Sequence, residues 1–212
     1  MTAAVDGSGD EESEIARRKA VVAAGGTDRE RWCDPASYEA FWSDRSVAAG
    51  QMLPPGLRVC DIGCGMQGLR AHLPAGSIYL PADLRAWTPE VLPCDLNAGL
   101  LPERYLAICD VVCLLGVIEY LYDLPAFFTA LRRRTETVLV SYNCVDFAAV
   151  DRAGYGWVNA LGSEQLLALL RDHGFEIAEV RRVGRMEILV RATQPRFGWL
   201  RRLRRDLRRR LS

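Results

Sequence analysis

Three glycines in the first half of the chain have a spacing that suits close contact with a ligand. Gly63, Gly65 and Gly68 lie within RVCDIGCGMQGLRAHL, the segment from residue 58 to residue 73. The G-x-G-x-x-G pattern is expected where a strand leads into a helix and the backbone lies against a cofactor. Because glycine has no Cβ, backbone N–H groups of this loop can approach the ligand, and the following helix presents its positive end.

Acidic residues near this loop indicate which type of cofactor it can bind. Asp83 ends the next predicted strand, where a dinucleotide fold also places the acid that binds the ribose hydroxyls. Asp61 lies two residues before Gly63, where its charge would repel a pyrophosphate but attract an ammonium group. Asp95 closes a short third strand and can accept from an adenine amino group. The helix after the loop is also interrupted early, by Pro74. A cationic amino acid joined to a nucleoside therefore fits better than a nicotinamide dinucleotide.

Strands alternate with helices after residue 56, which predicts a parallel sheet covered on both faces. The strands are expected at RVCDIG, SIYLPAD, VLPCDL, YLAICDVVCLLG and TVLVSYN. Two more, FEIAEVRRV and MEILVRA, are joined by a turn at Gly184 and form an antiparallel edge. The expected fold is thus α/β, a doubly wound and mostly parallel sheet of seven strands.

Capping residues mark two helices between these strands. Asp123 is expected to cap a helix with an apolar stripe that includes Phe127 and Phe128. Ser163 is expected to cap a second helix, EQLLALLRDH, which Gly174 ends.

The chain divides into four expected segments. They are an unstructured acidic N-terminus at 1–13, a helical leader or lid at 14–56, a cofactor-binding domain at 57–194 and a basic amphipathic helix at 195–212. In the leader, a helix from Glu14 to Val22 is ended by Gly25-Gly26, and residues 34–53 form one helix or two with Asp34 as the cap. Its aromatic side chains, Tyr38, Phe41 and Trp42, are expected to pack in the leader rather than to cover substrate.

From about Arg58 to Ala192 the chain resembles the class I S-adenosylmethionine-dependent methyltransferases. Four segments carry the resemblance in order: Asp61-Ile62-Gly63-Cys64-Gly65, Asp83-Leu84, Asp95-Leu96 and Leu115-Gly116-Val117-Ile118-Glu119-Tyr120. The resemblance implies a Rossmann-like methyltransferase fold and S-adenosyl-L-methionine as the cofactor. It also implies the residues that contact this cofactor, which are Asp61, Gly63, Cys64, Gly65, Asp83, Leu84, Asp95, Leu96, Leu115 and Gly116.

The resemblance further implies what each segment does. The glycine loop would lie under the methionine part of the cofactor, with the acid of the first segment near its ammonium group. The acid of the second segment would accept from both ribose hydroxyls, and the third segment would frame the adenine. The start of the fourth segment would face the amino acid end.

Glu119 and Tyr120 are the candidates for catalysis, ahead of His173 and Tyr142. A sulfonium is a good leaving group, so the protein mainly aligns the acceptor with the methyl group, and a base is needed only for a hydroxyl or a protonated amine. Tyr120 stands where many relatives have His, so the identity of the base stays open. Tyr142 and Asn143 end the fifth strand, where either can line the acceptor pocket.

We therefore expect a methyltransferase acting on a small or lipid-linked acceptor, at oxygen rather than nitrogen. The fourth strand is not followed by Asn/Asp-Pro-Pro-Tyr, which disfavours methylation of nucleic acid bases. Two alternatives stay open: an NAD(P)-dependent oxidoreductase, and a non-catalytic scaffold that retains the fold.

Charge is distributed unevenly along the chain. Residues 196–212 hold eight Arg against one Asp, whereas residues 1–195 carry 19 basic and 26 acidic side chains. Leucines at 200, 203, 207 and 211 share one face of a helix. Such a basic amphipathic segment favours binding to an anionic membrane surface slightly over a solvated tail that binds nothing. Binding to nucleic acid is the third and least favoured interpretation.

Cysteine usage and hydropathy indicate the compartment. The seven cysteines are expected to be buried free thiols in a reducing environment. No metal site is expected, because the chain has no C-x-x-C pair and only two His. The acidic N-terminus does not resemble a secretory signal, and the longest apolar run has eight residues, too few to span a bilayer. We expect a cytoplasmic protein, at most peripherally bound to a membrane.

Overall fold

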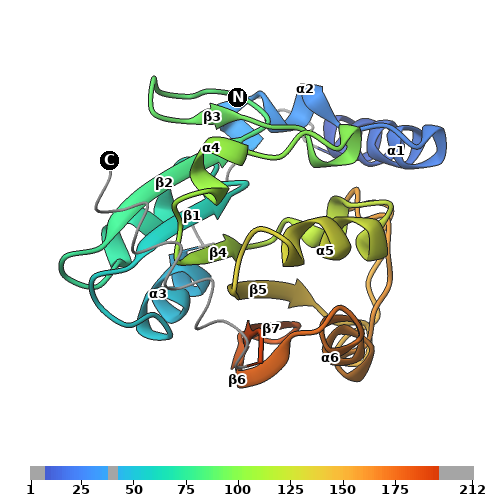
Figure 1. The fold of residues 1–212 in the computed structure, drawn as a ribbon. Coiled ribbons are helices and arrows are strands. Elements are labelled where there is room, and N and C mark those ends of the chain that lie inside the picture. The colour runs from blue at the N-terminus through green and yellow to red at the C-terminus, as the bar shows by residue number, and fades with distance from the viewer. Residues whose placement is uncertain (1–7, 38–42, 196–212) are drawn as a thin grey trace, which may run out of the picture.

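The computed structural model describes residues 8–37 and 43–195, which form one seven-stranded sheet with helices on both faces (Figure 1). The strand order is β3-β2-β1-β4-β5-β7-β6. The bounds are β1 (Arg58–Ile62), β2 (Ile78–Asp83), β3 (Leu92–Pro93), β4 (Val111–Leu114), β5 (Thr137–Asn143), β6 (Glu176–Val183) and β7 (Glu187–Thr193). Strands β1 to β5 pair in parallel, and β7 is antiparallel to both β5 and β6.

This strand order confirms the predicted fold class. It also indicates at which edge of the sheet a ligand is expected to bind. The chain moves outward from β1 to β3 and then returns to place β4 on the other side of β1. Ligands of open α/β sheets bind outside the carboxyl ends of the strands at such a reversal. The segments after β1 and β4, which carry two of the predicted motifs, therefore meet at one point.

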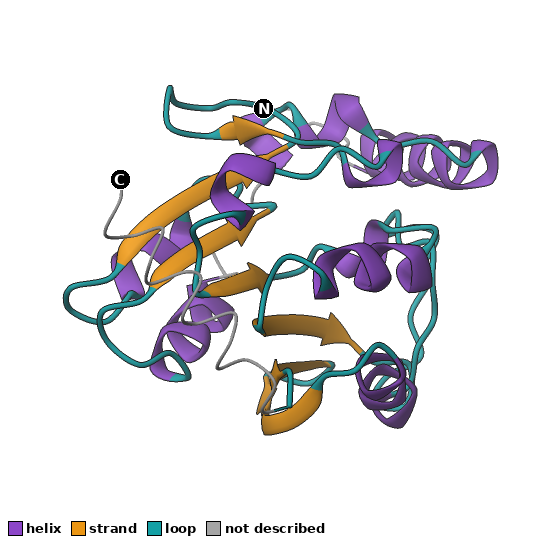
Figure 2. Ribbon diagram, in the orientation of Figure 1, coloured by secondary structure: helices purple, strands orange, loops and turns teal. Residues whose placement is uncertain are grey.

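Helices pack on both faces of the sheet, and α1 (Ser8–Ala24) and α2 (Arg29–Trp32) lie apart from those faces at one end of the molecule (Figure 2). The other α-helices are α3 (Ser43–Gln51), α4 (Glu103–Leu106), α5 (Leu124–Arg132) and α6 (Ser163–Asp172). Short 3₁₀ helices are η1 (Pro35–Ser37), η3 (Gly68–His72), η4 (Leu96–Ala98) and η5 (Ile118–Tyr120). Helices α5 and α6 lie on one side of the sheet and α3 on the other (Figure 1).

The two hydrophobic cores follow from the alternation of side chains along each strand. In β1, Cys60 and Ile62 face the core that contains Phe128 of α5, whereas Val59 faces the core that contains Ala49 of α3. By the same alternation Asp61 belongs to the face of Val59. A carboxylate at the end of this strand is therefore directed into the α3 side of the molecule.

All seven predicted strands are present, although the third and fourth are shorter than expected, and the α5 cap is confirmed. The Asp123 carboxylate accepts a hydrogen bond from Ala126 N at 2.9 Å, and Phe127 and Phe128 of α5 are buried. Gly184 joins β6 and β7 with a φ of +58°. Gly25 follows the end of α1 with a φ of +71°, as predicted for the helix stop.

Four sequence-based expectations were wrong in detail. Residues 8–13 are helical, since α1 begins at Ser8, and acidic residues in its first turns favour the positive end of the helix. The expected long fourth strand is only Val111–Leu114, because α4 takes its first residues. An apolar run does not by itself distinguish a strand from a helix. Gly162, not Ser163, caps α6, and the Ser163 hydroxyl instead bonds to Asp146 at 2.6 Å. The 3₁₀ helix η3 stands where a short α-helix was expected.

Two predictions concern residues outside those that the structure describes: the packing of Tyr38, Phe41 and Trp42, and the helix of the basic C-terminal segment.

All seven cysteines are free thiols, and six of them are buried. Within residues 8–37 and 43–195, no cluster of His, Cys, Asp or Glu could hold a metal ion. In the same part of the chain, no helix is both long enough and apolar enough to cross a bilayer.

Candidate functional site: a cleft at the carboxyl edge of the sheet

A cleft of about 1260 Å³ opens at the carboxyl ends of the parallel strands. It is lined by all the predicted cofactor-binding residues and by both leading catalytic candidates, which are Asp61, Gly63, Cys64, Gly65, Asp83, Leu84, Asp95, Leu96, Leu115, Gly116, Glu119 and Tyr120. Further walls come from α1 and α2, from the start of α3, from the loop at 151–157 and from the β6–β7 turn. The cleft is thus lined by segments that are far apart in the sequence.

The glycine loop is a tight turn that is crowded at Gly63. Gly63 has a φ of +74° and Gly65 a φ of +49°, both in the left-handed region that favours glycine. A Cβ on Gly63 would lie 2.4 Å from Cγ2 of Val117, which follows β4. Gly63 N and Cys64 N both donate to Ala82 O, at 2.8 Å and 3.1 Å, which ties the loop to β2.

Asp83 holds the second half of the loop. Its Oδ2 accepts from Gly65 N and its Oδ1 accepts from Leu84 N, both at 2.6 Å. Burial raises the pKa of this carboxyl, and the backbone donors oppose that rise. A carboxylate has about four lone-pair positions, so Asp83 keeps acceptor capacity for a ligand in the cleft.

Asp61 is a buried carboxyl whose only hydrogen bond in the described structure comes from the Tyr79 hydroxyl, at 2.7 Å. Burial raises the pKa of Asp61 to about 7, the bond from Tyr79 opposes the rise, and the negative charge of Asp83 adds to it. A cation placed beside Asp61 would restore its ionised form.

Asp95 lies under the leader. Its Oδ1 caps η4 by accepting from Ala98 N at 3.3 Å and also accepts from the Thr27 hydroxyl at 3.2 Å. Its other oxygen forms an ion pair with Arg29 of α2. The turn that the sequence analysis assigned to an adenine pocket is therefore covered by residues of the leader.

Arg45, from α3, lies across the glycine that follows β4. It pairs with Glu187 of β7 at 3.1 Å, and both side chains are 13% exposed. A Cβ on Gly116, whose φ is +69°, would lie 2.4 Å from Nη1 of Arg45. The positive charge of Arg45 also lowers the pKa of Asp61, so the guanidinium stands close to that end of the cleft.

Glu119 is fully buried at the wall of the cleft. Its Oε1 accepts from both the backbone and the side-chain nitrogen of Asn143, each at 2.9 Å, whereas its Oε2 has no hydrogen-bond partner. Burial raises the pKa of Glu119, and the charge of Glu187 adds to the rise. A carboxyl of raised pKa with one free oxygen is suited to take up a proton.

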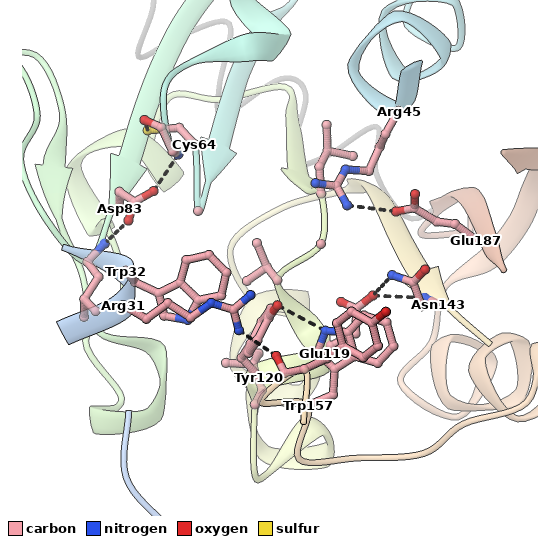
Figure 3. A pocket seen from close by; sticks show the side chains of 18 of the residues that line it. Arg31, Trp32, Arg45, Cys64, Asp83, Glu119, Tyr120, Asn143, Trp157 and Glu187 are labelled. Atoms are coloured by element: carbon pink, nitrogen blue, oxygen red, sulfur yellow. Dashed lines mark hydrogen bonds and ion pairs between the residues drawn. The ribbon is translucent and has the colours of Figure 1, made fainter. Parts of the chain in front are cut away.

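Tyr120 belongs to an aromatic wall beside Glu119 (Figure 3). Its hydroxyl accepts from Nε1 of Trp157 at 3.1 Å, and its ring meets Trp32 edge-on with centroids 4.8 Å apart. Tyr155 stacks on Trp157 at 4.8 Å. Burial raises the pKa of Tyr120 to about 12, so this phenol is neutral near pH 7 and is a donor rather than a base.

The two weaker candidates from the sequence lie outside the cleft lining. Nδ1 of His173 lies 2.7 Å from Leu169 O within its own helix end. The Tyr142 hydroxyl is held by Asn159 Oδ1 at 2.6 Å and by Leu161 N at 2.9 Å. Of the pair that ends β5, only Asn143 lines the cleft.

Comparison with known proteins bears on the fold. No protein-family model matches the sequence, and no curated protein matches it. Among solved structures, a 1,6-didemethyltoxoflavin N1-methyltransferase of Burkholderia thailandensis, with S-adenosylhomocysteine bound, aligns with a TM-score of 0.57 and 16% identity over 92% of this chain and 93% of that one. CalO1, a methyltransferase of calicheamicin biosynthesis, aligns with a TM-score of 0.59 and 16% identity over 87% of this chain and 69% of that one. The chain has the fold of class I methyltransferases.

Two further matches have the same methyltransferase fold. The mitomycin 7-O-methyltransferase MmcR aligns with a TM-score of 0.57 and 16% identity over 90% of this chain and 69% of that one. The chain spans about half, 54%, of the pyocyanin biosynthetic protein PhzM. At such low identities the likeness concerns the fold, and function must be argued from the cleft.

Sequence reasoning missed several residues of this methyltransferase-fold cleft. Those in the lining are Arg31 and Trp32 of α2, Arg45 of α3, and Tyr155 and Trp157 of the loop before α6. Tyr79 of β2, behind the lining, was missed as the donor to Asp61. A helix of four residues such as α2 gives no periodic signal. The only hint was the Arg-Trp pair between a Gly-Gly break and the Asp34 cap.

Proposed function

We propose that the chain transfers a methyl group from S-adenosylmethionine to a small or lipid-linked acceptor, at oxygen rather than nitrogen. The observation that carries this proposal is the meeting of a glycine turn and three buried aspartates in one cleft at the reversal point of the sheet. Solved structures of the same fold that hold S-adenosylhomocysteine support it.

The residues present fit this cofactor. Asp61 is a carboxyl that a neighbouring cation would ionise, as the ammonium of the methionine part requires. Asp83 keeps free lone pairs for the ribose hydroxyls, and Leu96, beside Asp95, offers backbone groups to the adenine. Arg45 lies at the Gly116 end, where it can bind the carboxylate of the methionine part.

The acceptor half of the cleft supplies alignment and a proton acceptor. The cofactor brings an electrophilic methyl group on a sulfonium, so this chain has to orient the acceptor atom and exclude water. Glu119 takes the proton of a hydroxyl acceptor on its free Oε2, while Asn143 holds Oε1 in place. Tyr120 and Trp157 form the wall against which the acceptor packs.

Ligand binding separates this proposal from the dinucleotide alternative. Trp32 and Trp157 line the cleft, so a bound nucleoside should change tryptophan fluorescence. We expect S-adenosylhomocysteine to quench the fluorescence of the full chain saturably and NADH to leave it unchanged. Saturable quenching by NADH alone would favour the oxidoreductase. Binding without turnover on any acceptor would favour the scaffold.

Asp83 provides a matched substitution for the same titration. Asp83→Ala should weaken the binding of S-adenosylhomocysteine by roughly 1–3 kcal/mol, because it removes an acceptor and leaves buried donors unpaired. Asp172→Ala, at the exposed end of α6 and outside the cleft, should bind as the unaltered chain does. An unchanged affinity in Asp83→Ala would remove Asp83 from the cofactor site.

A further inference from the structure

Arg31 is a buried cation on the acceptor side of the cleft that no carboxylate neutralises. Its residue is 7% exposed, and it lines the cleft beside Tyr120 and Trp157 (Figure 3). Among the residues that the structure describes, Arg31 takes part in no salt bridge, and its guanidinium has one hydrogen bond, from Nη1 to Tyr155 O at 2.6 Å. Burying a charge without an ionic partner is costly, and burial lowers the pKa of this guanidinium.

The acids whose charge reaches Arg31 are bound to other cations. Asp28 is bonded to Nη1 of Arg17 at 2.9 Å, and it accepts only the backbone N–H of Arg31. Glu14 forms ion pairs with Arg17 at 2.8 Å and with Arg18 at 3.1 Å. Tyr120, whose pKa is raised to about 12, contributes no negative charge near pH 7. The described surroundings therefore leave a positive charge at Arg31.

The free part of this guanidinium has the shape of a carboxylate receptor. Nη1 is taken by Tyr155 O, whereas Nε is buried without a hydrogen-bond partner and Nη2 has none in the described structure. The N–H bonds of Nε and Nη2 lie along one edge of the planar group. This edge matches the two oxygens of a carboxylate in a bidentate pair.

Aromatic side chains line the cleft beside Arg31. The Arg31 guanidinium lies 4.4 Å from the ring centroid of Trp32, and Trp32 meets Tyr120 edge-on. Trp157, which donates to Tyr120, continues the wall toward Glu119. Flat apolar walls favour a planar ligand, and Glu119, the candidate proton acceptor, lines the same cleft.

We propose that Arg31 binds the carboxylate of a planar aromatic acceptor, whose ring packs along Trp32, Tyr120 and Trp157. This inference rests on the proposed function, since it names the substrate class of the same cleft. The acceptor is thus a hydroxylated aromatic acid, with its carboxylate at Arg31 and its hydroxyl directed toward Glu119.

The test compares aromatic acids with their neutral amides. The full chain, with S-adenosylhomocysteine present, is titrated calorimetrically with salicylate, its meta and para isomers, and the three corresponding hydroxybenzamides. We expect at least one acid to bind about tenfold or more tightly than its amide, because the amide lacks the charge that pairs with Arg31. Arg31→Gln should bring the affinity of that acid down to the level of the amide.

Arg18→Gln is the matched control, since Arg18 also lines the cleft but has Glu14 and Gly154 O as partners. It should keep acid binding within about twofold. The inference is overturned if no acid binds, if acids bind no better than amides, or if Arg31→Gln binds the acid as the unaltered chain does.

Titration with S-adenosylhomocysteine alone distinguishes a failure of the proposed function from a failure of the carboxylate site at Arg31. Cofactor binding without Arg31-dependent acid binding contradicts this inference only. Acid binding that depends on Arg31, without any binding of S-adenosylhomocysteine, contradicts the proposed function and leaves the carboxylate site standing.

Thermal unfolding of the free chain gives a second readout that does not need a ligand. Arg31→Met removes a buried charge without an ionic partner, so the chain should unfold at the same or a higher temperature. Arg17→Met breaks ion pairs with Glu14 and Asp28 and should unfold at a lower temperature. A loss in Arg31→Met as large as that in Arg17→Met would show a structural role for Arg31 and contradict the carboxylate site.

Discussion

Asp61 is a buried acid of the cleft whose ionisation depends on what occupies the cleft. The residue is 3% exposed, its carboxyl accepts from the Tyr79 hydroxyl, and burial raises its pKa to about 7. In the free chain it is therefore only partly ionised near neutral pH. An ammonium group beside it would lower this pKa, so cofactor binding should release a proton.

The affinity for S-adenosylhomocysteine should accordingly rise as the pH increases through about 7 and fall on the acidic side. The sign follows because the proton on Asp61 must leave before its charge can pair with the ligand. Calorimetric titration at several pH values, in buffers of different ionisation enthalpy, measures both the affinity and the proton release.

Two variants sharpen this measurement. Asp61→Asn should bind more weakly and lose the pH dependence. Tyr79→Phe removes the hydrogen bond that opposes the raised pKa, so the midpoint of the pH dependence should move to higher pH. If the affinity of the unaltered chain does not change across this range, Asp61 does not bind the ammonium group.

Individual residues of the site were predictable only where they belong to a local sequence pattern. Gly63, Asp61 and Asp83 follow from the loop spacing and from the ends of predicted strands. Arg31 and Trp157 do not, because they meet through a leader helix and a loop that are over a hundred residues apart in sequence. Their juxtaposition is a property of tertiary packing.

At the scale of the elements, the turn between β1 and η3 is the most constrained part of the site. Gly63 combines a φ of +74° with a Cβ position 2.4 Å from Val117. Gly99 offers a matched comparison, since its φ is +72° and no atom lies within 4 Å of its Cβ position. The two glycines therefore differ in crowding although their φ angles are nearly the same.

Gly99→Ala should reduce the free energy of unfolding by about 1–2 kcal/mol, the cost of a left-handed alanine. Gly63→Ala should cost about 1–3 kcal/mol more, because the added carbon overpacks against Val117. Chemical denaturation of both variants measures the difference. An equal loss of unfolding free energy in both variants would mean that the Val117 side chain moves away at little cost and that the loop is not closely packed.

The strands were predictable as elements because their apolar runs are short and bounded by turns. The fourth strand shows the limit of this reasoning. Pro102 precedes α4, so the run from Tyr105 onward begins as a helix and becomes a strand only at Val111. Apolar composition alone does not show where the helix ends and the strand begins.

At the scale of the whole molecule, ion pairs join the leader to two residues that line the cleft. Arg29 pairs with Asp95 on the cofactor side, and Lys19 pairs with Asp151 at 2.7 Å on the loop side. The Tyr122 hydroxyl donates to Gly26 O at 3.1 Å between them. A leader of this kind was expected, but its pairing with Asp95 and Asp151 was not visible in the sequence.

The basic C-terminal segment at 196–212, which is outside the described residues, gives a prediction for the full chain. Its eight Arg and its row of leucines should bind anionic vesicles. Co-sedimentation of the full chain with such vesicles should exceed that of a chain ending at Gln194, and salt should weaken it. Equal sedimentation of the two chains would exclude this segment as a membrane anchor.

The central claim is that the cleft holds S-adenosylmethionine, and a crystal structure of the full chain with S-adenosylhomocysteine tests it most directly. We expect the ribose hydroxyls on Asp83, the ammonium group beside Asp61 and the adenine against the segment of Asp95. A ligand bound elsewhere, or one in the cleft that contacts neither Asp61 nor Asp83, would contradict it.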